Sequence, residues 1–163
     1  MTIKMLKKYK NKLKINKITL QDNAIIKPKY GESYNLSQFK LLTEGFSWYE
    51  KYGFKINKKT KKQHQINKEI INKIKIKDVK LENIILNVKN KKLPNNYLKP
   101  IIKYIKENQN EKLMKIMKEI FIYQRTDYTD LLYSLIIEKI LRNIEKNNDN
   151  YEKYKPTSYY MRL

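Results

Sequence analysis

Residues 35–54 read Asn-Leu-Ser-Gln-Phe-Lys-Leu-Leu-Thr-Glu-Gly-Phe-Ser-Trp-Tyr-Glu-Lys-Tyr-Gly-Phe, and they contain the strongest fold signals in the chain. Asn35 followed by Gln38 matches a capping box, which predicts the start of a helix. Apolar side chains then recur at helical spacing along two neighbouring stripes: Phe39, Leu42, Phe46 and Tyr49 in one, and Leu41, Gly45, Trp48 and Tyr52 in the other. The pattern predicts a helix up to Tyr52 with a broad buried face.

The two glycines of this stretch have different predicted roles. Gly53 suits the left-handed position just past a helix end, with Phe54 folding back onto the last turn. Gly45 would cost about 1 kcal/mol relative to alanine inside a helix. We therefore expect a backbone or a bulky ring to press close to Gly45, and we expect Trp48, Tyr49 and Phe54 to form core and cap.

The segments around this stretch predict an α+β protein. Residues 17–22 alternate like a strand, with Ile18 and Leu20 on one face, and a second short strand follows Phe54. Together they predict a small strand-helix-strand unit over residues 17–56. Residues 1–16 alternate lysines with single apolar residues, so they form either a basic N-terminal arm or a first structural element.

The rest of the chain is predicted to be mainly helical. Residues 57–65 are dominated by lysine and predict a basic linker, with His64 exposed in it. Residues 66–146 are predicted to be mainly helical, beginning with a helix at 66–74. Residues 73–77 instead alternate with a strand period, which predicts extended chain after the helix, and residues 79–88 are ambiguous. The polar, Tyr-rich tail, residues 147–163, is predicted to be mobile unless a partner binds it.

Further signals suggest where the later helices begin. Pro100 suits the first position of a helix, because its missing N–H is not needed there. Asp127 or Thr129 can cap the last long helix. Short connections predict that these helices pack as antiparallel neighbours.

Charge is the extreme property of the composition. The 163 residues include 37 Lys or Arg and 16 Asp or Glu, a formal charge of +21. A field of this size attracts polyanions, and lysine binds phosphate as a point charge without reading bases, which predicts salt-sensitive binding to nucleic acid. AT-rich coding also enriches Lys, Asn, Ile and Tyr, and an even spread of lysines over the surface would favour that origin.

Three basic segments, residues 7–17, 55–62 and 89–92, contain the candidate polyanion-binding lysines. These are Lys7, Lys8, Lys10, Lys12, Lys14, Lys17, Lys55, Lys58, Lys59, Lys61, Lys62, Lys89, Lys91 and Lys92. The chain also has 14 tyrosines, and tyrosine interleaved with lysine suits the stacking of bases and the binding of phosphates.

Several kinds of site are excluded by composition. There is no cysteine and a single histidine, so disulfides, a thiolate nucleophile and metal sites built from Cys or His clusters are excluded. With three glycines, a Gly-rich phosphate loop cannot be built. The mean hydropathy is −0.80 and the apolar runs are too short to span a bilayer. No apolar stretch follows the first lysines, so we expect an intracellular protein.

One segment resembles a known family. Trp48-Tyr49-Glu50-Lys51-Tyr52-Gly53-Phe54 resembles the Phe-Tyr-Glu-Lys-Leu-Gly-Phe segment that closes the last helix of GNAT-type N-acetyltransferases. The resemblance covers residues 17–56 and implies acetyl-CoA as cofactor and Tyr49 as general acid towards the leaving thiolate. The family's cofactor loop would precede residue 17, and residues 1–16 contain no glycine. The Lys-, Asn- and Ile-rich composition also resembles proteins of large DNA viruses.

The function favoured by the sequence is non-catalytic binding of a polyanion, nucleic acid above all, without a cofactor. One alternative is an acetyl-CoA-dependent, N-acetyltransferase-like protein, degenerate or active, that uses Tyr49. The other is a structural or assembly subunit whose helical part or C-terminal tail contacts a protein partner.

Overall fold

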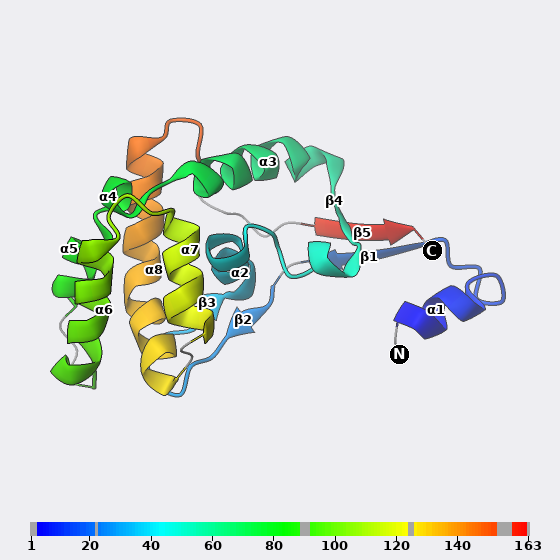
Figure 1. Ribbon diagram of the computed structural model, residues 1–163. Coiled ribbons are helices and arrows are strands. Elements are labelled where there is room, and N and C mark those ends of the chain that lie inside the picture. The colour runs from blue at the N-terminus through cyan, green and yellow to red at the C-terminus, as the bar shows by residue number, and fades with distance from the viewer. Residues whose placement is uncertain (1–2, 22, 89–91, 124–125, 153–157, 163) are drawn as a thin grey trace.

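The computed structural model describes residues 3–21, 23–88, 92–123, 126–152 and 158–162. The chain folds as the α+β protein that the sequence predicts, with small antiparallel sheets and a larger set of helices. Figure 1 shows the larger sheet at one end of the molecule, near both chain termini, and most helices at the other. We call residues 3–21, 48–62 and 158–162 the sheet end, and the other described residues the helical body.

The helices are α1 (Ile3–Tyr9), α2 (Leu36–Glu44), α3 (Lys58–Lys73), α4 (Ile76–Val79), α5 (Leu81–Leu86), α6 (Asn95–Glu107), α7 (Leu113–Lys118) and α8 (Asp127–Asn147). There are also a 3-10 segment, Glu50–Tyr52, and a π-helical turn, Glu119–Tyr123. The strands are β1 (Lys17–Gln21), β2 (Ile25–Ile26), β3 (Tyr34–Asn35), β4 (Lys55–Ile56) and β5 (Ser158–Arg162). They form a three-stranded sheet in the order β1-β5-β4 and a separate β2-β3 pair, both antiparallel.

The start of α2 agrees with the sequence pattern. The Oδ1 atom of Asn35 accepts hydrogen bonds from the backbone N–H groups of Ser37 at 2.8 Å and Gln38 at 3.1 Å. These bonds satisfy two of the donors that the first turn of a helix leaves unpaired. Phe39 and Leu42 are buried in the core of the helical body, as their spacing predicts.

The end of α2 differs from the prediction. A helix through Gly45 to Tyr52 is wrong, because α2 ends at Glu44 and Gly45 takes the left-handed conformation with a φ of 73°. A Cβ atom at Gly45 would lie 2.9 Å from the sulfur of Met114 in α7. The close neighbour that we expect at Gly45 is therefore a methionine side chain, and the glycine serves as a helix C-cap.

The second glycine behaves as predicted. Gly53 follows the 3-10 segment with a φ of 81°, and the N–H of Phe54 donates to the carbonyl of Tyr49 at 3.2 Å. Phe54 is buried, whereas Trp48 is 38 % exposed. The prediction that Trp48 belongs to the core is therefore wrong: the chain leaves the α2 axis at Gly45, and the helical spacing that would bury Trp48 no longer holds.

The C-terminal segment supplies the central strand of the larger sheet. The prediction of a mobile tail over residues 147–163 is wrong for residues 158–162, which pair with β1 on one side and β4 on the other. Tyr159 is 1 % exposed and Met161 is 6 % exposed. Only long-range pairing holds this strand in place, and a local pattern does not reveal its partners.

A small core fills the inner side of this sheet. The predicted first element within residues 1–16 is helix α1, and its Ile3 packs against that core. The buried members are Phe54, Ile56, Tyr159 and Met161, and Ile18, Leu20 and Tyr49 pack beside them. Ile18 and Leu20 share a face, as the alternation of β1 predicts.

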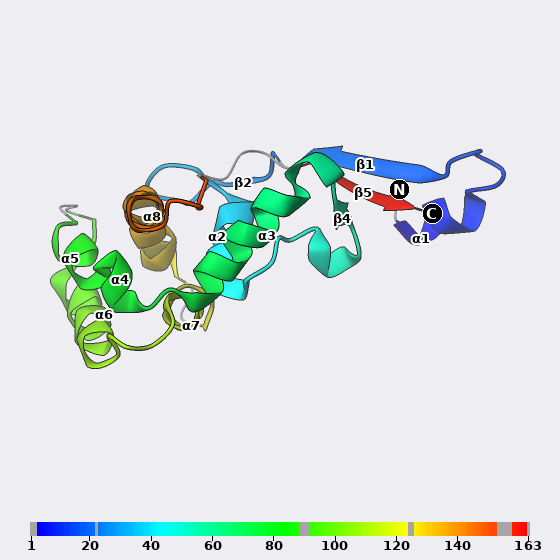
Figure 2. The ribbon, with the colours of Figure 1, turned by 90° about the horizontal axis from the view of Figure 1, so that it is seen from above.

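The predicted basic linker over residues 57–65 is wrong, because α3 begins at Lys58. Asn57 caps it, with its Oδ1 atom accepting from the N–H of Lys59 at 3.2 Å. The stretch has no Gly or Pro to stop a helix. The buried residues of α3 recur at helical spacing on one face, and they are His64, Asn67 and Ile71. The predicted helix at 66–74 is confirmed as the second part of α3, which runs from the sheet end to the helical body (Figure 2). The extended chain predicted after it is wrong from Ile76, where α4 begins.

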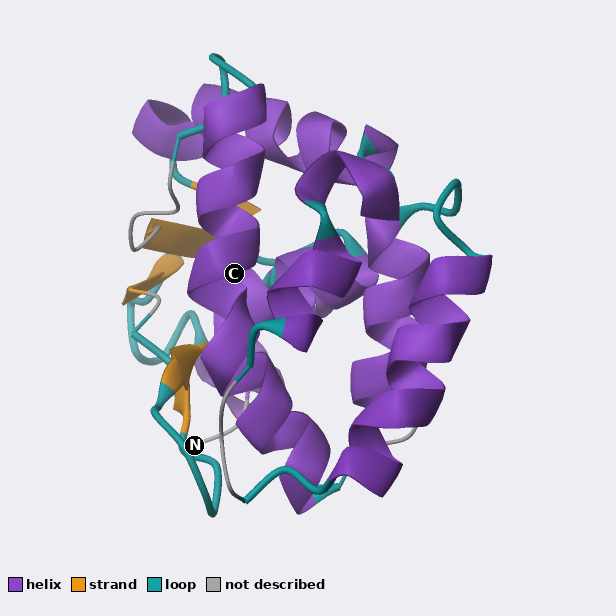
Figure 3. Cartoon of the chain, turned by 90° about the vertical axis from the view of Figure 1, so that its left-hand side faces the viewer, coloured by secondary structure: helices purple, strands orange, loops and turns teal. Residues whose placement is uncertain are grey.

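The helical body has a large core to which α8 contributes many residues. Figure 3 views the molecule from the side of this helical body. Nine residues of α8 are buried, among them Leu132 and Tyr133 with essentially no exposure. The residue that caps α8 is Thr126, not Asp127 or Thr129. Thr126 Oγ1 accepts the N–H of Thr129 at 3.2 Å, so the cap lies just before the two predicted positions.

Pro100 lies inside α6 and not at its start. Pro94 is the N-cap residue, and Pro100 is the sixth residue of α6. A proline at this place removes the hydrogen bond to the carbonyl of Asn96. Both Pro100 and Asn96 are exposed, so water can satisfy that carbonyl and the helix tolerates the proline.

Candidate functional site

The outer face of the three-stranded sheet is the centre of the candidate site. Side chains alternate across each strand, so Tyr160, which lies between the buried Tyr159 and Met161 of β5, faces outward. Tyr160 stands in the central strand, directly opposite Thr19 of β1 and Lys55 of β4. The outer row therefore places an aromatic ring in the middle of the sheet with a lysine beside it.

Cations surround this ring. Lys17 Nζ lies 5.2 Å from the centroid of the Tyr160 ring, a cation–π distance. Lys17 is also directly opposite Arg162 in the β1–β5 register. Like charges at directly opposite positions destabilise an antiparallel pair, and an anion between them would relieve the repulsion.

Three hollows border Tyr160. They have volumes of about 230, 310 and 470 Å³. Basic residues line all of them: Lys17, Lys58 and Arg162 the first, Lys55 and Arg162 the second, and Lys55, Lys58 and Lys61 the third. The ring is thus bordered by concave, positively charged surface.

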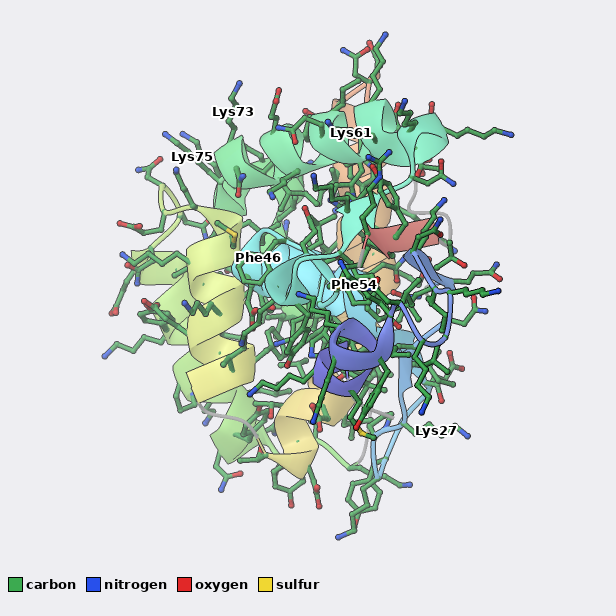
Figure 4. All side chains as sticks on the ribbon, turned by 90° about the vertical axis from the view of Figure 1, so that its right-hand side faces the viewer. Lys27, Phe46, Phe54, Lys61, Lys73 and Lys75 are labelled. Atoms are coloured by element: carbon green, nitrogen blue, oxygen red, sulfur yellow. The ribbon has the colours of Figure 1, made fainter. Side chains whose placement is uncertain are left out.

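The first turns of α3 add further positive charge. Lys58, Lys59, Lys61 and Lys62 lie there, and no acidic residue is present in the first turn. The N-terminal end of a helix carries partial positive charge, so cations there are unfavourable in the absence of a bound anion. Figure 4 looks onto the sheet end and shows Lys61 on this half of α3, with Lys73 towards its opposite end.

Charge is segregated between the two parts of the molecule. The sheet end has 14 Lys or Arg and one acidic residue, Glu50, which is a net charge of +13 in 39 residues. The other 124 residues contain 23 basic and 15 acidic side chains, a net charge of +8. All 14 basic residues of the sheet end are exposed, and none of the ion pairs between described residues involves them.

Glu50 has a structural position that joins the sheet end to α3. Its Oε2 atom accepts the N–H of Ser47 at 2.7 Å and lies 3.3 Å from Nε2 of His64, and its Oε1 atom lies 3.6 Å from Nζ of Lys68. Burial raises the pKa of Glu50, but His64, the Ser47 N–H and Lys68 outweigh burial and lower this pKa to about 2. Glu50 is therefore a carboxylate at neutral pH and neutralises little of the exposed charge.

His64 is not the exposed loop residue that the sequence predicts. It is 5 % exposed, because α3 turns this side of the helix towards Glu50. The distance from His64 Nε2 to Glu50 Oε2 is within the range of an ion pair, but the angles are not those of a hydrogen bond. Neither ring nitrogen of His64 has a hydrogen-bond partner among the described residues. His64 also lines the hollow of about 470 Å³.

Most of the candidate lysines belong to the sheet end. Those in the sheet end are Lys7, Lys8, Lys10, Lys12, Lys14, Lys17, Lys55, Lys58, Lys59, Lys61 and Lys62. Lys92 is separate from them: it belongs to the helical body, where its Nζ lies 5.0 Å from the centroid of the Tyr30 ring. Lys89 and Lys91 lie outside the described residues.

Sequence reasoning missed Tyr160 and Arg162 as site residues. The signal for them is the alternation in Ser158-Tyr159-Tyr160-Met161-Arg162, which is typical of a strand with one buried face. It is short and lies in a polar tail, so its period alone is a weak indication. Pairing with β1 and β4 brings these two residues into the basic surface.

Tyr49, the residue singled out by the family resemblance, packs beside the small core. Its ring centroid lies 5.0 Å from that of Tyr159 and 6.2 Å from that of Phe54. Strand β5 lies between β1 and β4, so the two strands of the predicted strand-helix-strand unit are not neighbours in the sheet. An acetyl-CoA role for Tyr49 stays a prediction.

Comparison with protein-family models, with curated proteins and with solved structures finds no significant match. Within the part of the chain that the structure describes, no group of three or more His, Asp or Glu side chains could hold a metal ion. Over the same residues, no helix is both long and apolar enough to cross a bilayer.

Proposed function

We propose that the protein binds nucleic acid without sequence specificity, through the sheet end. The observation that carries the proposal is the segregation of charge: +13 in the 39 residues of the sheet end, against +8 in the other 124. Coding bias alone acts on the whole chain and would enrich lysine in both parts. In the helical body acidic residues accompany the lysines, whereas in the sheet end they are almost absent.

The chemistry of the surface fits phosphate. Exposed lysines on α1, the loop after it, β1, β4 and α3 lie around one small sheet. Lysine contacts a phosphate as a point charge and carries no base preference. Each contact releases a condensed counterion, so affinity falls steeply as salt rises.

The proposal is tested by fluorescence anisotropy of labelled DNA and RNA with the full-length protein over a series of salt concentrations. We expect log K to fall linearly with log salt, with a slope of about 0.7 to 0.9 per phosphate contacted. The variant Lys55→Glu/Lys58→Glu/Lys61→Glu should bind at least about tenfold more weakly and show a shallower slope.

The matched control is Lys73→Glu/Lys77→Glu/Lys99→Glu, which changes the formal charge equally but in exposed positions of the helical body. It should bind within about threefold of the wild type, because surface charges beyond a Debye length are largely screened. Equal losses in the two variants would mean that net charge alone drives binding. Absence of binding at low salt would refute the proposal.

A further inference from the structure

We infer that the sheet end selects single-stranded nucleic acid, with an unpaired base stacked on the ring of Tyr160. The inference rests on the proposed function and names its substrate class. It starts from the place of Tyr160 in the fold, at the centre of the outer face of a sheet whose inner face is a packed core.

The Tyr160 ring is held as a platform. Its neighbours along β5, Tyr159 and Met161, are 1 % and 6 % exposed and anchor the strand in the small core. The strand pairs on both sides, with Thr19 and Lys55 directly opposite Tyr160. Stacking of a base on this ring therefore costs little conformational entropy, because the strand that carries the ring is already ordered.

Concave surface borders the ring on the side of β4. The hollow of about 310 Å³ is lined by Gly53, Lys55 and Arg162, and that of about 470 Å³ extends between β4 and α3. Clefts of roughly 300 Å³ and above accommodate small-molecule groups. A flipped-out base has space to lie against the ring, with its phosphates directed to the lysines at the rim.

The cations are placed to hold the backbone on either side of such a base. Lys17 lies on β1 and Lys55 on β4, the two strands that flank β5. Arg162 lies opposite Lys17. Lys58 lines one hollow together with these two residues and another with Lys55. None of these four takes part in an ion pair between described residues. Alternating aromatic and cationic contacts are typical of surfaces that bind single strands without sequence preference.

A duplex does not fit this arrangement equally well. Its bases are stacked on one another and expose only their edges in the grooves, so an aromatic ring on a sheet face has no base face to meet. A duplex can still contact the lysines through its phosphates. The structure therefore predicts two components of binding: a salt-sensitive one shared by both forms, and a stacking one that only single strands provide.

The test compares the full-length protein with its Tyr160→Ala and Tyr160→Phe variants. The probes are labelled oligo(dT), oligo(U) and a DNA duplex with the same number of phosphates. Tyr160→Ala should weaken binding to the single strands roughly tenfold, the size of one lost base stack, and leave duplex binding within about twofold. Tyr160→Phe keeps the ring and should bind as the wild type does. Comparison of the affinities for oligo(dT) and oligo(U) shows whether single-stranded DNA or RNA is the preferred ligand.

Tyr128→Ala is the matched control, because Tyr128 is an exposed tyrosine of the helical body. Quenching of a 2-aminopurine base in the strand gives a second readout, and it should be lost in Tyr160→Ala and kept in Tyr160→Phe. If both single strands bind and Tyr160→Ala changes neither affinity nor quenching, the inference is overturned while the proposed function stands. If no nucleic acid binds at low salt, both fail together.

Discussion

The sheet end and the helical body differ in the size of their hydrophobic cores and in the pairing of their charges. The helical body has a core of 28 buried hydrophobic residues, whereas the sheet end has a core of four, counted over the described residues. Six lysines of the helical body pair with acidic residues, whereas the basic residues of the sheet end are exposed and take part in no such pair within the described part of the chain. Burial stabilises the first part, and self-repulsion destabilises the second.

A sheet of this size needs support from the larger part, and a few contacts provide it. Glu50 of the sheet end approaches His64 of α3, in the helical body. Within the helical body, the side chain of Asn67 on α3 forms hydrogen bonds with the backbone of Glu152 at 2.8 and 3.3 Å, ahead of the segment that leads to β5. Helix α3 therefore connects the two parts: its first turns carry exposed lysines of the sheet end, and its later turns pack in the helical body. The predictions below test whether the two parts differ in stability and how strongly they are joined.

The largest difference should appear between two core truncations. Leu132→Ala, in the helical body, removes a fully buried side chain and should cost about 2 to 5 kcal/mol of unfolding free energy. Tyr159→Ala, in the sheet end, should cost about 3 kcal/mol but act locally, because a small core can open without the rest. Urea unfolding is followed by far-UV circular dichroism for the helices and by fluorescence of Trp48, the sole tryptophan, for the sheet end.

Leu132→Ala should lower the midpoints of both probes. Tyr159→Ala should lower the fluorescence midpoint while the circular dichroism midpoint stays near that of the wild type. Equal shifts of both probes in both variants would mean that the molecule unfolds as one unit, and the distinction between the two parts would then hold for charge alone.

An intermediate loss of unfolding free energy is expected when Glu50 is protonated at low pH. The pKa of Glu50 is about 2 in the folded protein, below its value in the unfolded chain, so Glu50 contributes stability that is complete above about pH 4.5. This stability is lost as the pH falls from about 4.5 towards 2, and we expect a loss of about 1 to 2 kcal/mol because Glu50 is partly exposed. Unfolding of the wild type and of Glu50→Gln across this range measures it.

Glu50→Gln should be less stable than the wild type at pH 7 and approach it at low pH. Glu69→Gln changes an exposed glutamate on α3 and serves as the control, with a pH dependence like that of the wild type. A Glu50→Gln variant that keeps the wild-type pH dependence would show that the contact with α3 does not join the two parts.

The smallest difference concerns Gly45 and Gly53, which both have a positive φ. Alanine at either position costs about 1 kcal/mol or more in backbone strain. In Gly45→Ala the new Cβ would also lie 2.9 Å from the Met114 sulfur and 3.0 Å from Asn72 Oδ1, whereas in Gly53→Ala the nearest atom, on Met161, is 3.8 Å away. Gly45→Ala should therefore lower the free energy of unfolding in urea by about 1 kcal/mol more than Gly53→Ala does. Equal losses in the two variants would mean that the side chains next to Gly45 move aside without cost.

Local signals in the sequence predicted local structure well. The Asn35 cap, the strand at β1, the left-handed Gly53 and the α+β class all follow from patterns within a few residues of each other. Other predictions were wrong because a neighbour distant in sequence decided the outcome, whereas the basic linker and the cap of α8 were wrong within local stretches. Met114 packs at Gly45, and Glu50 meets a histidine that the pattern assigns to an exposed loop.

The same division holds for the candidate site. Eleven of the fourteen candidate lysines belong to the sheet end, since runs of lysine are visible in any local window. Tyr160 and Arg162 were missed because their role depends on β5 pairing with strands more than 100 residues away in the chain.

The amino-acid sequence by itself determined the charge, the absence of cysteine, the helix and turn signals and the apolar periods, since each depends on residue type and short spacing. Only the tertiary structure decided that residues 158–162 form the central strand, that His64 is buried and that the exposed lysines of α1, β1, β4 and the start of α3 belong to one end of the molecule. Long-range strand pairing and packing bring together residues that no local pattern relates, and the site is built from those encounters.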